Sequence, residues 1–210
     1  MLEKVIELTN DYIDTMPKKE RKKYGQFFTS METARFMANL YDITSDMTKI
    51  SVLDAGAGSG ILACAFLERV ERLPFVEEIE VTCYENDEKI LQLLENNLKY
   101  CQQKSTKKIS FSIVKENYIL SQYLDFNCMI GGNPNPKKYD FVIGNPPYMK
   151  IPKTHQKLQL CRKFVMEHLI FILYLRLWDS LICVMKGKWY ISYHVHGHQV
   201  LILGDLENIF

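Results

Sequence analysis

Two periodicities of apolar residues follow one another along this chain. Residues 2–15 carry apolar side chains at helical spacing and stop before Pro17, which predicts a short amphipathic helix. Similar helical patterns recur at 34–40, 61–67 and 90–98. Short apolar or alternating runs, typical of strands, lie at 51–54, 79–84, 109–114 and 141–143. This succession predicts an α/β fold, with a mostly parallel sheet and helices on both faces.

One helix is expected to begin near Thr29. Thr29 and Glu32 have the spacing of a capping box, in which the threonine side chain would cap the helix. Phe27 and Phe28 come directly before this start. One interpretation of the two rings is a hydrophobic staple at the helix end. The other is a wall of a cofactor pocket.

Composition limits the class of protein. With 210 residues, 47% of them hydrophobic, the chain can bury one sizeable core, as one domain or a piece of something larger. A net charge of +1 gives no general attraction to a polyanion. Six cysteines without C-x-x-C spacing favour reduced thiols and a cytoplasmic location. No apolar stretch approaches the roughly 20 residues that cross a bilayer, so we expect no membrane association.

The first chemical signal is the glycine-rich turn after Asp54. Glycines at 56, 58 and 60 let the backbone approach a ligand closely. The dinucleotide fingerprint needs a glycine at position 61, which is isoleucine, so a nicotinamide or flavin site is disfavoured. The Asp54 carboxylate can accept hydrogen bonds from an ammonium group or from water near it.

Two further positions suit a nucleoside. Glu85 closes the second strand about 25 residues beyond the glycine turn, where an acid can accept hydrogen bonds from both hydroxyls of a ribose. Asn117 follows the third strand, where such folds contact adenine, although a surface loop is a competing interpretation. The glycine turn and Glu85 together predict a nucleoside site.

The second chemical signal follows the last predicted strand. Gly144 and two prolines stop that strand abruptly, which places Asn145 and Tyr148 at a strand's carboxyl end, where open α/β sheets keep their sites. The Asn145 amide oxygen and the Pro146 carbonyl can accept both hydrogens of an exocyclic or amide nitrogen and so localise its lone pair. The Tyr148 ring can stack on a planar substrate. This arrangement suits methyl transfer to nitrogen.

Together, the segments GQFFTS, VLDAGAGSGIL, YE and IGNPPY resemble those of S-adenosylmethionine-dependent N6-adenine DNA methyltransferases of restriction-modification systems. Their order is that of the gamma arrangement, and the resemblance covers residues 20–151. It implies a Rossmann-like class I methyltransferase fold and S-adenosyl-L-methionine as cofactor. It also implies double-stranded DNA as the substrate, and it leaves room for restriction-modification partner subunits.

The resemblance also implies residue roles. The cofactor would contact Phe27, Phe28, Thr29, Asp54, Gly56, Gly58, Gly60, Glu85 and Asn117, the last of which replaces the family's usual aspartate. A flipped adenine would lie against Asn145, Pro146, Pro147 and Tyr148. The implied reaction is direct displacement at the sulfonium methyl, with no covalent enzyme intermediate and no metal.

After Pro152 the resemblance stops. Back-translated and read one base earlier, residues 160–175 are compatible with MPEVCYGAPNLYFLF and residues 190–210 with YIIPRSWTSGAYFRRFREYF, and both strings resemble the family's continuation. A frameshift near Lys153 is therefore our hypothesis for the tail. It predicts an incomplete sheet, without strands after the fourth. The expected divisions are a helical segment (1–49), a cofactor-binding catalytic domain (50–152) and an atypical tail (153–210).

Three functions stay open from these residues. The first is an adenine-specific DNA methyltransferase, with an inactive fragment of one as its limiting case. The second is a protein-glutamine or RNA-base N-methyltransferase, because an amide nitrogen poses the same lone-pair problem. The position of residues 25–30 ahead of the glycine turn favours the first. The third is a non-catalytic remnant that binds the cofactor or DNA.

Overall fold

A computed structural model describes residues 1–19, 28–118, 121 and 139–145, together with the backbone of three later strands. The helices are α1 (Leu2–Asp14), α3 (Met31–Asn39), α4 (Ile61–Val70) and α5 (Glu88–Lys104). The strands are β1 (Lys49–Asp54), β2 (Glu78–Tyr84), β3 (Lys108–Val114), β4 (Phe141–Ile143), β5 (Leu181–Met185), β6 (Lys188–Val195) and β7 (His198–Asp205). Every helix and strand predicted from the apolar periodicity is present.

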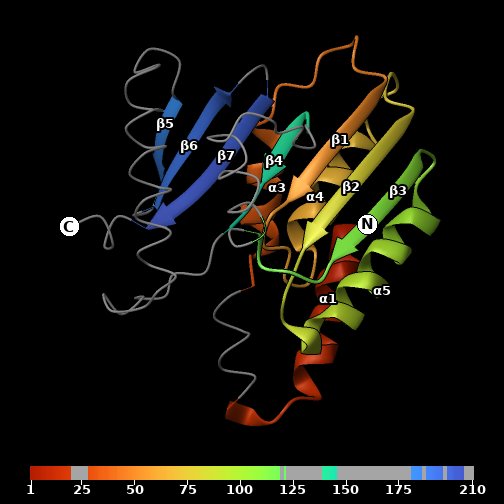
Figure 1. Ribbon diagram of the computed structural model, residues 1–210, viewed down its shortest axis with the longest axis vertical. Helices are drawn as coiled ribbons and strands as arrows, with labels where there is room; N and C mark the ends of the chain where they lie inside the picture. The colour runs from red at the N-terminus through yellow and green to blue at the C-terminus, as the bar shows by residue number, and fades with distance from the viewer. Residues whose placement is uncertain are drawn as a thin grey trace.

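The strands form one sheet in the order β3-β2-β1-β4-β7-β6-β5 (Figure 1). β2 and β4 flank β1, both parallel to it, and β3 continues the parallel part beyond β2. The chain therefore runs outward from β1 in one direction through β2 and β3, and then returns to the other side of β1 as β4. Open α/β sheets bind ligands at such a reversal of strand order. The fold is Rossmann-like, as expected from the sequence.

The described helices form one connected layer. α4 packs against α1, α3 and α5 and also contacts β1, behind which it lies in Figure 1. All its residues from Ile61 to Glu68 are buried, which makes α4 the centre of the core. A second helical layer, expected on the opposite face of the sheet, would have to come from outside the described ranges. Within those ranges, no helix is long and apolar enough to span a membrane.

The tail differs from the expectation of a sheet that ends at β4. β7 pairs in parallel with β4, and β6 and β5 continue the sheet in antiparallel pairings. The prediction that strands after the fourth are absent is therefore wrong. An open strand edge offers N–H and C=O groups to any extended segment, and the tail contains apolar runs with β-branched residues at 181–185 and 200–203.

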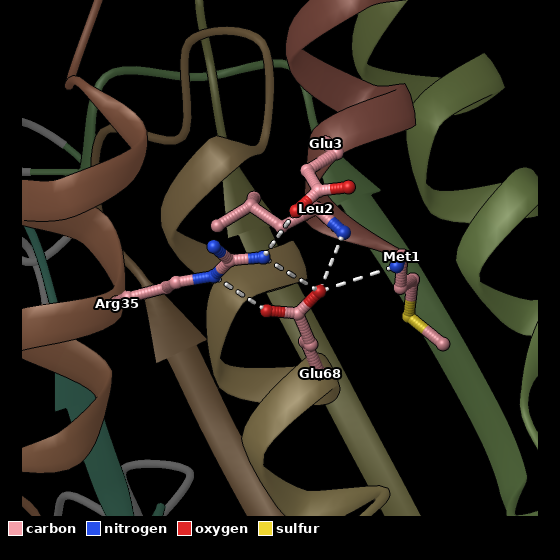
Figure 2. A network of polar contacts seen from close by, with 5 residues as sticks. All are labelled: Met1, Leu2, Glu3, Arg35 and Glu68. Atoms are coloured by element: carbon pink, nitrogen blue, oxygen red, sulfur yellow. Dashed lines mark hydrogen bonds and ion pairs between the residues drawn. The ribbon is translucent and has the colours of Figure 1, made fainter.

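Glu68 attaches the beginning of α1 to α4. Its carboxylate accepts hydrogen bonds from the Leu2 amide and from Arg35 Nε, both at 2.9 Å, and lies 3.2 Å from the Met1 ammonium (Figure 2). Burial alone would raise the pKa of Glu68. The hydrogen bonds from Arg35, the Leu2 amide and the Met1 ammonium lower the pKa by more than burial raises it, so that it falls from 4.5 to about 2. The charged carboxylate therefore stabilises the contact between the two helices.

We expect Glu68→Gln to lower the free energy of unfolding by about 1–3 kcal/mol at pH 7, because two cationic groups lose their buried partner. The folded-state pKa of about 2 lies below the ordinary 4.5. The contribution is therefore complete above about pH 4.5 and is lost as the pH falls toward 2. Urea unfolding at pH 7 and pH 3 should show a smaller difference between wild type and variant at pH 3.

Glu3→Gln is the matched control for this change. The Glu3 carboxylate also pairs with Arg35, at 3.4 Å, but 75% of its side chain is exposed. Exposed ion pairs contribute little to stability, so this variant should unfold like the wild type. Equal losses in the two variants would contradict the role given to Glu68.

Candidate cofactor and substrate site

The carboxyl ends of β1 and β4 bring the two chemical signals of the sequence together. Asp54, the last residue of β1, is in register with Ile143, the last residue of β4. The Ala55 amide also donates to the Ile143 carbonyl at 3.4 Å. The glycine turn and Asn145 therefore leave the sheet side by side, at the point where the strand order reverses.

The glycine turn has the backbone conformation that its composition predicts. Gly58 and Gly60 have φ values of 54° and 81°, in the left-handed region that favours glycine. The Ala57 amide donates to the Tyr84 carbonyl at 2.9 Å, which ties the turn to the end of β2. A Cβ built on Gly56 would meet nothing within 4 Å, so the backbone there is open to a ligand.

Asp54 is completely buried beneath this turn. Neither carboxylate oxygen makes a hydrogen bond of good geometry within the described residues, although the amides of Gly56 and Ala63 lie close enough to interact with the carboxylate. Burial raises the pKa of Asp54 to about 7; the amides of Gly56 and Ala63 offset part of this rise, and the Glu85 charge adds to it. A buried carboxyl group that only two imperfectly placed amides approach is costly to the fold, which is expected where a residue serves a site.

Glu85, at the end of β2, holds the same turn through hydrogen bonds to its carboxylate. One carboxylate oxygen accepts from the Gly58 amide at 2.8 Å. The other accepts from the amides of Asn86 and Asp87, each at 2.8 Å. Sequence reasoning placed an acid at this strand end but did not foresee that three backbone amides hold it. Glu85 therefore shapes the turn, and its predicted contact with a ribose stays a prediction.

The segment ahead of the glycine turn reaches both halves of the site. The Phe28 ring lies 3.5 Å from the position of a Cβ on Gly58, and it also packs with the Ile90 and Leu93 cluster of α5. The next residue, Thr29, accepts a hydrogen bond from Asn145 Nδ2 at 2.9 Å. Residues 28 and 29 thus connect the predicted cofactor side to the predicted substrate side.

The predicted helix cap at Thr29 is wrong by one residue. Ser30 is the N-cap of α3, and its hydroxyl accepts from the Thr33 amide at 3.2 Å. Thr29 lies one residue before this cap, and its hydroxyl accepts from Asn145. Both residues fit the general preference of helix starts for hydroxyl side chains, so the sequence alone did not distinguish them.

Two anchors hold β4, which has only three residues. At its beginning, Asp140 Oδ2 accepts from both the amide and the hydroxyl of Ser51, each at 2.7 Å. Further along, the Tyr41 hydroxyl donates to the Val142 carbonyl at 2.7 Å. Neither Asp140 nor Tyr41 was identified by sequence reasoning, because an acid before a strand and a tyrosine in a loop form no recognisable pattern.

The Tyr41 ring is itself fixed by aromatic packing. It makes edge-on contacts with Phe66 of α4 and Phe141 of β4, at centroid distances of 5.5 and 5.3 Å. Burial raises the pKa of Tyr41 well above its ordinary value, so the hydroxyl stays protonated and can donate. The position of Asn145 therefore depends on the core between α4 and β4.

The remaining predicted site residues divide into two groups. Asn117 is half-buried just beyond β3, and its carbonyl accepts from the Ser121 amide at 3.0 Å. Its predicted contact with adenine stays a prediction. Four other residues lie outside the described ranges, namely Phe27, Pro146, Pro147 and Tyr148. In the part of the chain that is described, no three His, Cys, Asp or Glu side chains gather as metal ligands.

Comparison with known proteins identifies the family. The sequence model of the Eco57I restriction-modification methylase family matches residues 33–168, more than half of the chain. This protein belongs to that family. The match continues past Pro152, where the resemblance was expected to end.

Two curated relatives agree with this assignment. The Type II methyltransferase M.PstI of Providencia stuartii is 31% identical over 156 residues, which are 73% of this chain and 29% of the relative. The Type II methyltransferase M.BsuBI of Bacillus subtilis is 30% identical over 152 residues, 71% of this chain and again 29% of the relative. The chain thus spans less than a third of the length of these relatives.

Solved structures resemble this chain more distantly. A putative O-methyltransferase from Klebsiella pneumoniae has a TM-score of 0.44 and 12% identity, covering 90% of this chain and 85% of that one. The methyltransferase subunit of a type I restriction-modification system from Streptococcus thermophilus has a TM-score of 0.40 and 19% identity, covering 59% and 24%. Similarities of this size carry no functional argument.

We expect Asp54→Asn to stabilise the ligand-free protein at pH 8 by at least about 1 kcal/mol, or about 2–4 °C in Tm. The folded-state pKa of about 7 lies above the ordinary 3.8, so ionisation of Asp54 costs the fold stability as the pH rises from about 4 to 7. Asparagine does not titrate. The difference in Tm should therefore grow over this pH range.

Asp46→Asn serves as the control, because its carboxylate is exposed and accepts from the Thr44 hydroxyl. This variant should gain no stability at pH 8. A lower Tm for Asp54→Asn at every pH would mean that the buried carboxyl group is satisfied inside the protein.

Proposed function

We propose that this chain binds S-adenosyl-L-methionine and belongs to an enzyme that methylates the N6 amino group of a flipped adenine in double-stranded DNA. The hydrogen bond between Thr29 and Asn145 is the observation that carries the proposal. It joins the segment ahead of the glycine turn to the segment after β4. A cofactor held by the first and a base held by the second would then be adjacent.

The residues around the glycine turn fit this cofactor. Asp54 offers a buried carboxylate that makes no hydrogen bond of good geometry within the described residues, and an ammonium group would supply both charge and hydrogen bonds. The open backbone at Gly56 allows close approach, and Glu85 lies at the end of β2 for a ribose. When bound, S-adenosyl-L-methionine supplies the electrophilic methyl group.

Asn145 is the residue that would contact the base. Its Nδ2 donates to Thr29, which fixes the amide so that Oδ1 faces the other way. We assign Oδ1, with the Pro146 carbonyl, to the two hydrogens of the adenine N6 amine, and Tyr148 to stacking on the ring. Pro147 would hold the segment in shape. The protein thus contributes position and polarisation to the nitrogen rather than a nucleophile.

Family membership supports the choice of DNA over other substrates. The curated relatives are named as Type II methyltransferases, although this chain matches only part of each. We therefore propose cytoplasmic double-stranded DNA as the substrate and restriction-modification subunits as candidate partners. Transfer to glutamine in a protein or to an RNA base would use the same Asn145 chemistry and forms the competing outcome.

Two measurements test the proposal. Calorimetric titration with S-adenosyl-L-methionine should show saturable binding that weakens about 10- to 100-fold in Asp54→Asn, because a charge-assisted hydrogen bond is lost. Transfer of labelled methyl to adenine-containing duplex DNA should be abolished in Asn145→Ala, while its cofactor affinity stays within about threefold of wild type.

Each failure has a distinct meaning. Saturable binding without transfer to DNA, RNA or a glutamine peptide would leave a cofactor-binding remnant. No binding by a cooperatively folded wild type would overturn the cofactor assignment. Loss of cofactor binding in Asn145→Ala would mean that Asn145 contacts the cofactor rather than the substrate.

We also propose that residues after about Lys153 are encoded out of frame, although the family match extends to residue 168. The two family-like strings in the neighbouring frame support this idea, and they occur in the family's order. Sequencing of the gene should find both strings in one continuous alternative frame that begins between codons 153 and 160. A gene sequence whose codons exclude either string would contradict the proposal.

A further inference from the structure

Asn97 lies on α5 directly behind the glycine turn and is completely buried. Its Nδ2 donates to the Ser59 carbonyl at 2.9 Å and to the Thr9 hydroxyl at 3.2 Å. Thr9 belongs to α1, and Ser59 immediately precedes Gly60, the N-cap of α4. One amide group therefore connects the turn to two helices.

The turn is held from two sides. On the side of the sheet, Glu85 accepts from the Gly58 amide. α5 also contacts the turn closely, because a Cβ on Gly60 would lie 2.7 Å from Leu94 Cδ1. Asn97 stands one turn of α5 after Leu94, since residues three apart lie on the same helix face. Its bond to Ser59 fixes the carbonyl just before the left-handed Gly60.

Stability alone does not explain an asparagine at this position. Asn97 Oδ1 is buried and has no hydrogen-bond partner among the described residues, and the same is true of Ser59 Oγ. A buried amide oxygen without a partner destabilises the fold, which an apolar side chain at this position would avoid. Such local costs are expected where a residue serves a site.

We infer that Asn97 is a positioning residue for cofactor binding. Through the Ser59 carbonyl it holds the turn in the conformation that presents its backbone to the ligand, without touching the ligand itself. The inference rests on the proposed function, in which this turn binds S-adenosyl-L-methionine. It predicts that loss of the Asn97 amide weakens binding by more than the accompanying loss of stability explains.

The experiment compares Asn97→Ala with two controls in the full chain. Thr9→Val removes the contact with α1 but keeps the bond to Ser59. Leu98→Ala truncates a buried core residue of the same helix and should destabilise the fold at least as much. Tm, affinity for S-adenosyl-L-methionine by calorimetry, and amide hydrogen exchange of residues 55–61 are measured for each variant.

We expect about tenfold weaker binding and faster exchange of residues 55–61 in Asn97→Ala, with near wild-type values in Thr9→Val and Leu98→Ala. Equal affinity in Asn97→Ala and wild type, or an equal loss in Leu98→Ala, would overturn the inference. If the wild type binds no cofactor, the proposed function fails, and hydrogen exchange alone tests whether Asn97 holds the turn in position. Faster exchange of the turn in Asn97→Ala only would then support the positioning role, and unchanged exchange would refute it.

Discussion

β1 and β4 pair over three residues, and the candidate site depends on this short pairing. It aligns Asp54 with Ile143, so that the buried carboxyl group and the Asn145 amide leave the sheet together. Three pairs of residues hold a strand weakly, and the protein adds the Asp140–Ser51 clamp and the Tyr41 hydroxyl to keep β4 in register. A shift of one residue would turn each side chain to the opposite face.

Patterns with a short period were enough to predict the described helices, the strands up to β4, and the glycine turn. Alternation and apolar runs gave the strands, and glycines at 56, 58 and 60 gave a turn whose left-handed residues are indeed Gly58 and Gly60. Contacts between residues far apart in the sequence have no comparable local pattern that would predict them. Tyr41, Asp140 and Asn97 act through partners from 38 to 101 positions away, and nothing in a local window marks them.

The two errors have a common physical origin. At 29–30 two adjacent hydroxyl residues were equally suited to capping, and in the structure Ser30 caps the helix while Thr29 bonds Asn145. In the tail, three strands continue the sheet from the edge of β4, where the sequence had predicted none. A helix start accepts several hydroxyl residues as its cap, and an open strand edge accepts many extended segments. In both places the local sequence therefore allowed more than one outcome, and only the tertiary structure shows which residues are used.

The three amides around Glu85 change how ligand binding should be described there. A carboxylate has about four acceptor positions, and Gly58, Asn86 and Asp87 already occupy three of them. In the proposed complex, one ribose hydroxyl would add to this set, but a second would have to displace an amide. Ribose binding at Glu85 would then exchange one hydrogen-bond partner for another. It would yield less affinity than a carboxylate without these amides, but the turn would already have its bound conformation before the ligand arrives.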